Sequence, residues 1–487
     1  MTRSAGIIVF AVALLVPCRG NCGLRISDFG LRGGIAKAPG LDDGPAHTQA
    51  AIVKGRALGD ATLKSPVFGL LLSVLRFPPP EFESGYRFPE MIPLPAARSA
   101  LHEYADAALL VAALLLASYL ILRRRSRRGI FALMIAALLY FGFVRDGCIC
   151  PIGAIQNVTL TAFDSSYAIP LVAAAFFVIP LVFTLFCGRV FCGAVCPLGA
   201  IQDAVLIHPV RVPRWLESGL RLLAYTYLGA AVLFAAVGGV FLICRYDPFV
   251  GFFRLSGNWN ILILGVSLLV IGLFVGRPYC RFLCPYGVIL RQLSRLSKKR
   301  VTITPNECIK CRLCEDACPF GAIREPTEDW PEGEYKIAKR RLALFLLLLP
   351  VLVAAGGWAG YSLKERLARV HPMVRTAERV YLEESGQVTG TTNASDAFRT
   401  TGRTSESLYR QATAIRGQFA VGGAVLGAFI GLVAAGKLIA LSVRRRRTEY
   451  EADPASCFAC GRCYQYCPKE HERRKKNTGT SLARENR

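Results

Sequence analysis

Eight of the 18 cysteines fall into two groups with the same spacing, C-x2-C-x2-C-x3-C followed by proline. Cysteine thiolates are the ligands of iron–sulfur clusters, and this run is typical of bacterial proteins that hold two [4Fe–4S] clusters. In such proteins three closely spaced cysteines bind one cluster, and the fourth binds the other. The sequence therefore predicts two clusters with exchanged fourth ligands: Cys308, Cys311, Cys314 and Cys467 for one, and Cys457, Cys460, Cys463 and Cys318 for the other.

Zinc is the alternative metal for these cysteines, because it also accepts four thiolates. The spacing with a trailing proline, present at both Cys318-Pro319 and Cys467-Pro468, is far more specific to clusters. Clusters require a reducing compartment, in which thiolates survive. The neighbouring residues supply no nucleophile–base or acid–base pair, so the predicted chemistry is one-electron transfer, tuned by burial and by hydrogen bonds to sulfur.

A second set of cysteines belongs to a short repeat at the borders of apolar runs. Its copies are Cys150–Gln156, Cys196–Gln202 and, more loosely, Cys284–Leu290. Proline after the cysteine ends the preceding span, and glycine at a fixed offset lets the chain reverse. The second and third copies have a further cysteine four residues earlier, which makes C-x3-C-P. We expect these four thiols to hold a further iron–sulfur or metal centre, or to form redox-active disulfides, with buried structural cysteines as the alternative: Cys192, Cys196, Cys280 and Cys284.

Three other cysteines, Cys148, Cys150 and Cys244, are placed by the counting of spans at the opposite border. The first copy of the repeat has Asp146 where the others have their upstream cysteine. The hydrocarbon layer is about 30 Å thick, so electrons that cross it need stations at both faces. As a hypothesis, these three thiols form an outer metal or redox station.

These motifs resemble those of the NosR/NapH group of membrane polyferredoxins, which are linked to nitrous-oxide and nitrate respiration. The resemblance rests on Cys192–Ala200 and Cys280–Gly287, followed by the ferredoxin motif, and covers roughly residues 105 to 470. It implies electron transfer between the membrane quinol pool, with quinone as a cofactor, and a redox system outside. NosR-type members also have a periplasmic flavin-binding domain. Here the stretch 386–392 resembles a flavinylation loop without that domain and is interpreted as linker, so an FMN-binding protein is expected as a separate extracytoplasmic partner.

The elements that must position the cysteines are membrane helices. The 487-residue chain is 53% hydrophobic and only 19% charged, with a mean hydropathy of +0.38. Backbone groups in lipid must be satisfied within their own segment, so the long apolar runs are predicted to be helical and to contact the bilayer. Seven spans are expected, at 106–122, 129–144, 168–187, 222–244, 259–276, 341–360 and 418–442.

The net charge of +25 does not indicate nucleic-acid binding, and no nucleic-acid partner is expected. Arginines gather at the ends of apolar runs, at 123–128 and 444–447, which is the positive-inside pattern of membrane proteins. The first of these clusters places the turn after the first span in the cytoplasm. Two spans separate the two ferredoxin motifs, so both motifs return to that side.

The predicted fold is an α-helical polytopic protein of about seven spans in the bacterial inner membrane, with a small α+β bacterial-type two-cluster ferredoxin module on the cytoplasmic face. Residues 362–385 are expected to form an amphipathic helix and 386–404 a loop. The predicted segments are a signal peptide or short anchor (1–22), an extracytoplasmic segment (23–105), a five-span membrane domain (106–300), the first half of the ferredoxin module (301–340), a sixth span (341–360), an extracytoplasmic loop (361–417), a seventh span (418–442), the second half of the module (443–470) and a disordered tail (471–487).

The leading functional interpretation is an electron-transfer subunit rather than a stand-alone catalyst. It would pass electrons between the quinol pool or a cytoplasmic donor and an extracytoplasmic redox partner. The alternative is a redox-active assembly or regulatory factor for a respiratory metalloenzyme, since the cytochrome-oxidase accessory polyferredoxins share both cysteine motifs. A third interpretation, a transporter with accessory clusters, lacks the expected intramembrane relay of carboxylates or arginines.

Overall fold

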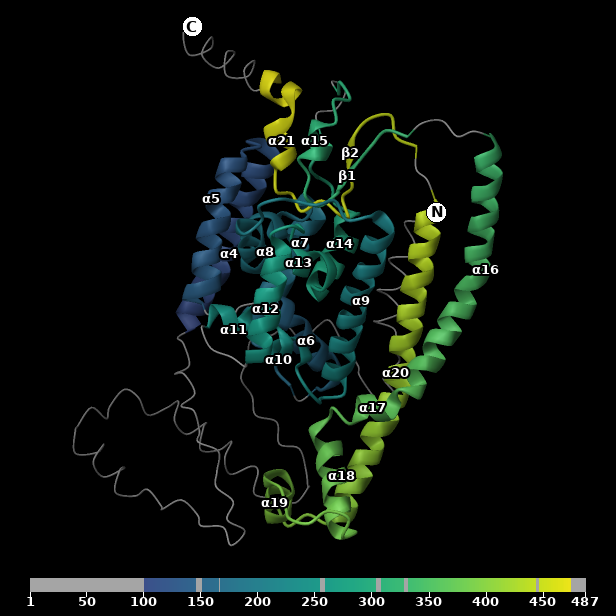
Figure 1. Cartoon of the computed structure of the whole chain (residues 1–487). Helices are drawn as coiled ribbons and strands as arrows, with labels where there is room; N and C mark the ends of the chain where they lie inside the picture. The colour runs from purple at the N-terminus through teal and green to yellow at the C-terminus, as the bar shows by residue number, and fades with distance from the viewer. Residues whose placement is uncertain are drawn as a thin grey trace, which may run out of the picture. The chain divides into compact units, whose positions relative to one another are not determined.

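The computed structural model describes residues 100–145, 151–165, 167–254, 259–303, 308–327, 332–443 and 446–473. The predictions for residues 1–99 and for the end of the tail lie outside these residues, as do Cys148 and Cys150. Within the described residues the chain is mostly helical, with one sheet of two short strands (Figure 1).

Among the residues that the structure describes, five helices are long and apolar enough to cross a membrane, by length and composition. They are Leu101–Arg123, Arg127–Val144, Arg214–Ala236, Tyr335–Ser362 and Ser405–Ser442. Each corresponds to a predicted span. The other two predicted spans correspond to the shorter apolar helices α7 (Leu171–Cys187) and α12 (Trp259–Gly272). A helix rises 1.5 Å per residue, so α7 is only about 26 Å long. The exact number of crossings therefore stays a prediction.

The first two long helices each end in a π-helical turn. Helix α4 (Ala100–Ser118) continues as η1 (Tyr119–Arg123), and α5 (Arg127–Ala137) continues as η2 (Leu138–Val144). Asp106 of α4 forms an ion pair with Arg145, with 2.5 Å between Oδ2 and Nη2, and both side chains are buried. The pair joins two neighbouring helix ends rather than forming a relay.

Short helices fill the space among the long ones. Three begin at the proline that follows a repeat cysteine: α6 (Pro151–Phe163), α8 (Pro197–Ala204) and α14 (Pro285–Ser294). Proline suits the first position of a helix, where its missing N–H is not needed. The segment 145–167 contains α6, whose Ile152, Ile155 and Gln156 are buried. The same interior holds η3 (Phe191–Val195), α10 (Leu242–Tyr246), α11 (Val250–Phe253) and α13 (Pro278–Phe282).

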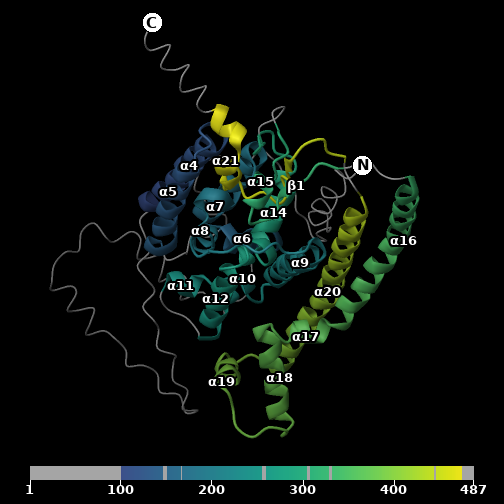
Figure 2. The same cartoon turned by 45° about the horizontal axis from the view of Figure 1, so that its top comes forward.

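Helices α16 (Glu332–Ser362) and α20 (Ser405–Ser442) run side by side along most of their length (Figures 1 and 2). Glycines every fourth residue allow this approach. A Cβ added at Gly427 would collide with the carbonyl of Gly356, and one added at Gly360 would collide with the carbonyl of Gly423. Small residues at such spacing let helix backbones come close in membranes. Helix α9 (Arg214–Ala236) packs on the other side of α20, where a Cβ at Gly422 would collide with Leu233.

The segment between α16 and α20 differs from its prediction. The amphipathic helix is divided at Pro372 into α17 (Lys364–Ala368) and α18 (Pro372–Glu384). Its apolar face is buried at Val374 and Val380, but Tyr381 is exposed. The expected loop over 386–404 contains α19 (Asn393–Thr400), which a capping box at Thr392 begins. Helix α20 starts at Ser405, well before the predicted start of the span at 418.

The two ferredoxin motifs meet in one module at one end of the helices. Strand β1 (Ile323–Arg324) pairs antiparallel with β2 (Glu451–Ala452), in the register Ile323 with Ala452. Beside the strands lie the short helices α15 (Leu313–Asp316) and α21 (Arg462–Tyr466), in contact with each other (Figure 2). Strands only two residues long hold the halves together weakly, so side chains must complete the junction.

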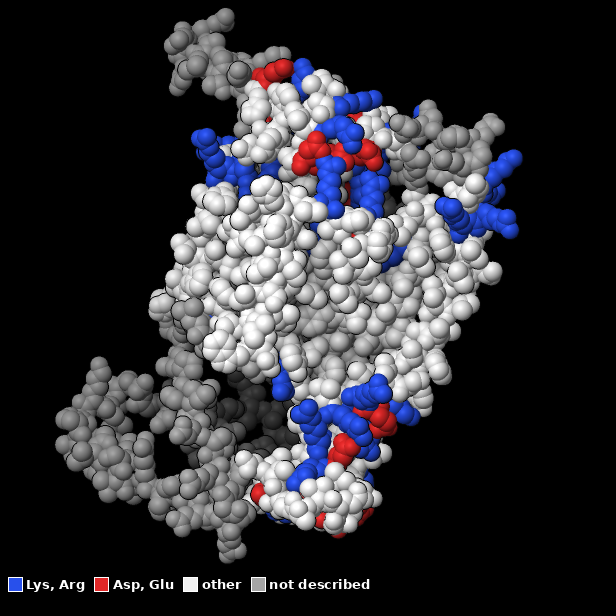
Figure 3. Space-filling view, in the orientation of Figure 1, with Lys and Arg blue, Asp and Glu red and all other residues white. Residues whose placement is uncertain are grey.

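Charged side chains gather at two levels on the face shown in Figure 3, with a band of uncharged surface between them. One level covers the ferredoxin module and the nearby helix ends, and the other covers α17 and α18. Charged groups avoid the hydrocarbon layer. The uncharged band therefore agrees with a chain that lies in a membrane with the ferredoxin module at one border.

Candidate iron–sulfur sites

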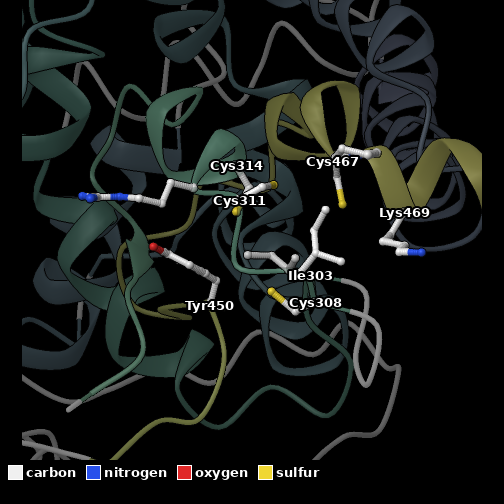
Figure 4. Close-up of a pocket in the computed structure, with 10 residues that line it drawn as sticks. Ile303, Cys308, Cys311, Cys314, Tyr450, Cys467 and Lys469 are labelled. Atoms are coloured by element: carbon white, nitrogen blue, oxygen red, sulfur yellow. The ribbon is translucent and has the colours of Figure 1, made fainter.

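The first site is a pocket lined by four cysteines, three from the first motif and one from the second. Cys308, Cys311 and Cys314 come from the loop before and within α15, and Cys467 follows α21. Ile303, Arg312, Tyr450 and Lys469 are among the other residues that line this pocket, which Figure 4 shows in close-up. This is the donor set that the exchanged-ligand prediction requires for one cluster.

The second site is a pocket with the complementary set of cysteines. Cys457, Cys460 and Cys463 come from the second motif, and Cys318 comes from the first. Phe320 and Phe458 also line it, with 4.8 Å between their ring centroids. The structure thus brings together each predicted set of four in a separate pocket.

The two cysteine loops have the same backbone pattern. The second and fourth residues after the first cysteine have positive φ: Lys310 at 53° and Arg312 at 63° in one loop, Ala459 at 55° and Gly461 at 73° in the other. Left-handed conformations cost roughly 1–2 kcal/mol for residues other than glycine. Three such residues persist because the loop must turn its cysteines toward one point.

Cysteine chemistry in the pockets fits iron–sulfur clusters. Burial raises the pKa of Cys457 to about 12 and, together with the neighbouring Cys467 and Cys308, raises the pKa of Cys314 to about 11. The thiols are therefore protonated when no metal is bound, and cluster binding must release protons. Backbone amides of Ala322 and Ala459 donate hydrogen bonds to Cys318 and Cys457, both at 3.4 Å, as expected for groups that tune a cluster. Among the described residues no His, Cys, Asp or Glu group is arranged to hold a single metal ion.

Side chains complete the junction of the two halves. Asp453 accepts hydrogen bonds from Ser456 Oγ at 2.9 Å and from Arg324 Nη2 at 3.3 Å, so it ties the second motif to β1. Although burial opposes it, the charge of Arg324 with these hydrogen bonds lowers the pKa of Asp453. The carboxylate is therefore ionised in the folded module.

The predicted border cysteines also come together. Cys192, Cys196, Cys280 and Cys284 are all buried. Cys196 and Cys284 lie immediately before α8 and α14, and the other two lie within η3 and α13. Burial, and then the nearby thiolates of Cys280, Cys196 and Cys192, raises the pKa of Cys284 well above its ordinary value. These four, here called the border cysteine group, therefore lie within electrostatic reach of one another.

Gln202, the last residue of the second repeat copy, holds the border cysteine group in position. Its Nε2 donates to Cys280 Sγ at 3.3 Å, and its Oε1 accepts from the backbone N–H of Tyr279 at 3.0 Å. Sequence reasoning noted this glutamine only as part of the repeat and did not predict its role. The signal was present, because glutamine ends both well-matched copies.

Cys244 lies apart from the border cysteine group, beside α6. Gln156, the last residue of the first repeat copy, accepts hydrogen bonds from the backbone N–H groups of Ile243 at 3.0 Å and Cys244 at 3.4 Å. Like Gln202, Gln156 accepts a hydrogen bond from the backbone N–H of the residue before a cysteine, but its amide nitrogen does not donate to the sulfur of Cys244. The outer station itself stays a prediction, since Cys148 and Cys150 lie outside the described residues.

Comparisons with known proteins show which class of domain this chain contains. Residues 169–214 and 258–304 match a family described as a 4Fe-4S binding domain, and residues 301–324 match a second family with the same description. The first match includes all of the border cysteine group, and the second includes Cys308 to Cys318. The chain therefore contains segments that match 4Fe–4S binding domains, as the resemblance predicted.

Individual relatives agree with this class. The chain is 31% identical over 118 residues to YccM of Escherichia coli, a candidate electron transport protein. The aligned residues make up 33% of YccM and 22% of this chain. It is 31% identical over 122 residues to NirI of Paracoccus denitrificans, covering 24% of this chain and 18% of NirI. It is 46% identical over 35 residues to Ferredoxin-1 of Caulobacter vibrioides, covering 7% of this chain and 31% of that protein. The chain thus spans a third or less of the length of these relatives, and no solved structure matches it.

Proposed function

We propose that this chain is an electron-transfer protein of the bacterial inner membrane that holds two [4Fe–4S] clusters on its cytoplasmic side. Cys308, Cys311, Cys314 and Cys467 would bind one cluster, and Cys318, Cys457, Cys460 and Cys463 the other. The single observation that carries the proposal is the exchange of the fourth cysteine between the two pockets. This exchange is a property of two-cluster ferredoxins, in which the fourth cysteine of each motif binds the other cluster.

We propose further that the border cysteine group binds an additional iron–sulfur or metal centre. Support comes from its four thiols, which lie within electrostatic reach of one another, and from the hydrogen bonds that Gln202 and the backbone of Gly287 donate to sulfur. Ordered donors around sulfur tune a bound centre, whereas inert structural cysteines need none. The match of these segments to a 4Fe-4S binding domain also supports a bound centre at these cysteines.

The direction of insertion follows from the arginine turn between α4 and α5. This turn contacts the ferredoxin module, because Arg125 forms an ion pair with Glu470. The positive-inside rule assigns such a turn to the cytoplasm. The module would then receive electrons from a cytoplasmic donor or from quinol, and an extracytoplasmic redox protein, such as a flavoprotein, would exchange electrons with the other side.

The test begins with iron and acid-labile sulfide per chain after anaerobic purification. Two clusters require about eight irons, and a clear excess would assign metal to the border cysteine group. A quinol is then added anaerobically, and bleaching of the cluster absorbance is recorded. Iron well below eight would contradict the proposal. Intact quinol oxidation in a deletion strain, together with loss of metal from a respiratory oxidase, would favour the assembly-factor alternative.

A further inference from the structure

Two fully enclosed arginines lie between the second cysteine pocket and the border cysteine group. Arg189 is 2% exposed and Arg277 is 0% exposed. Burying a guanidinium is unfavourable unless charged or polar groups surround it. The groups that surround these two arginines therefore indicate the role of their positive charges.

Arg277 contacts both sites. Its Nη1 donates a hydrogen bond to the backbone oxygen of Cys192, and its charge interacts with the thiols of Cys280 and Cys192 on one side and Cys460 on the other. Its guanidinium carbon lies 5.6 Å from the ring centroid of Phe458. Arg277 itself has φ of 51°, in the left-handed region, so the backbone accepts an unfavourable conformation to place this side chain.

Arg189 makes the same connection from another element. Its Nη2 lies 3.8 Å from Cys192 Sγ, and its Nη1 donates to the backbone oxygen of Ala455 at 3.3 Å. Its guanidinium carbon lies 4.1 Å from the ring centroid of Phe458, and its charge also reaches the thiol of Cys457. Phe458 is thus stacked against both arginines while it lines the second pocket.

Carboxylates do not balance this positive charge. Asp203 is the acidic partner of Arg277, at 3.7 Å, but it is shared with Arg127 at 2.8 Å and Arg462 at 3.3 Å. Salt bridges to Arg189 are absent from the described residues. Thiolates of metal-bound cysteines would supply the missing negative charge on both sides of the two arginines.

The backbones of the two sites are also in contact. A Cβ added at Gly193, between Cys192 and Cys196, would collide with the carbonyl of Phe458, so only glycine lets the loops approach this closely. The first pocket has a different lining, in which Ile303, Tyr450 and Lys469 accompany the cysteines. Neither Phe458 nor either of the two arginines lines the first pocket.

We propose that Arg189 and Arg277, stacked on Phe458, form an electrostatic bridge that couples the second cysteine pocket, and not the first, to the border cysteine group. The inference rests on the proposed function. Across this contact one electron would move and no bond would break: a cluster held in the second pocket would lose the electron that a centre held by the border cysteine group gains, or the reverse. A fixed positive charge beside thiolate ligands favours the reduced, more negative state, so the bridge raises the reduction potential on both sides.

The test uses the full-length protein purified anaerobically, with potentiometric titration followed by electron paramagnetic resonance. Arg277→Gln keeps hydrogen-bond donors but removes the charge, Arg277→Lys keeps the charge, and Arg312→Gln removes a charge that lines the first pocket. We expect Arg277→Gln to lower the midpoint potential of the second-pocket signal by about 59 mV or more, a tenfold change in a one-electron equilibrium. The first-pocket signal should stay unchanged, and Arg277→Lys should restore most of the loss.

Signals are assigned beforehand with Cys311→Ser for the first pocket and Cys460→Ser for the second. An unchanged second-pocket potential in Arg277→Gln, or an equal shift of both signals, would overturn the bridge. Should Arg277→Gln fail to load iron, Arg189→Gln is judged by the same criteria. Wild-type protein without clusters would defeat the proposed function itself, whereas normal clusters without the selective shift would defeat only this inference.

Discussion

Arg125 and Glu470, 345 residues apart in the chain, form a buried ion pair with 2.7 Å between Nη1 and Oε2. Arg125 has φ of 52° and also donates to the backbone oxygen of Thr302 at 3.1 Å. Its guanidinium carbon lies 4.8 Å from the ring centroid of Tyr464. One side chain of the arginine turn therefore holds both halves of the ferredoxin module against the membrane helices. The positive-inside rule explains the presence of the turn, but it does not explain this burial.

Removing one partner of this pair should loosen the second half of the module. Loss of one partner of a buried ion pair costs about 3–5 kcal/mol, because a charge is left buried alone. Glu470→Gln should therefore increase hydrogen exchange across residues 446–473. Arg125→Met with Glu470→Met removes both charges and should be less disruptive than either single change. Equal exchange in Glu470→Gln and wild type would show that the contact does not hold the module.

The exchange of fourth cysteines predicts which substitutions remove the same cluster. Cys467→Ser and Cys314→Ser, although 153 positions apart, should remove one and the same paramagnetic signal, because both residues line the first pocket. Cys318→Ser should instead remove the signal that Cys460→Ser removes. If Cys318→Ser and Cys314→Ser removed the same signal, each cluster would be bound within a single motif.

The contact between α16 and α20 predicts opposite results for two glycines of one helix. Gly427→Leu should clash with the backbone at Gly356, force the helices apart and lower the melting temperature, because α20 leads directly into the second ferredoxin motif. Gly436→Leu is the matched control, since a Cβ at Gly436 meets no atom within 4 Å. Melting curves and iron retention in detergent provide the measurement. Equal losses in both variants would mean that leucine, rather than the helix contact, causes the effect.

Asp453 predicts how the junction of the halves depends on pH. The pKa of Asp453 is lowered in the folded module. The ionised carboxylate therefore stabilises the folded protein at pH values above its unfolded pKa of about 3.9. This stabilisation is lost as the pH falls through the lower pKa of the folded state. Hydrogen bonds to a charged group contribute about 2 kcal/mol. Asp453→Asn should lower the melting temperature of the cluster-free protein at pH 7, and the difference should shrink as the pH approaches 3. A difference that stays constant with pH would show that its charge is unimportant.

Local signals in the sequence were enough to predict much of the site. The spacing of the ferredoxin cysteines predicted which four would share a pocket, because the short loops leave few ways to turn three sulfurs toward one point. Apolar runs predicted the long helices but not the start of α20, because this helix extends beyond its apolar run. The short helix α6, which has the polar Gln156 among its buried residues, was not predicted from the sequence.

The groups that surround the sulfurs could not be predicted in this way. Gln202 donates a hydrogen bond to Cys280, and the guanidinium groups of Arg189 and Arg277 lie over the ring of Phe458. Asp203 forms ion pairs with three arginines. The partners in each of these contacts are far apart in the sequence. Apart from Gln202, whose place in the repeat was a local signal, nothing in the local spacing distinguishes these side chains from surface residues.

Cysteine spacing and the apolar runs thus specified the kind of cofactor and the membrane setting, because ligand geometry and lipid solvation both act on neighbouring residues. Folding decided how close the two pockets and the border cysteine group would lie. That proximity depends on buried charges and glycine contacts between distant segments, which only the packed helices bring together.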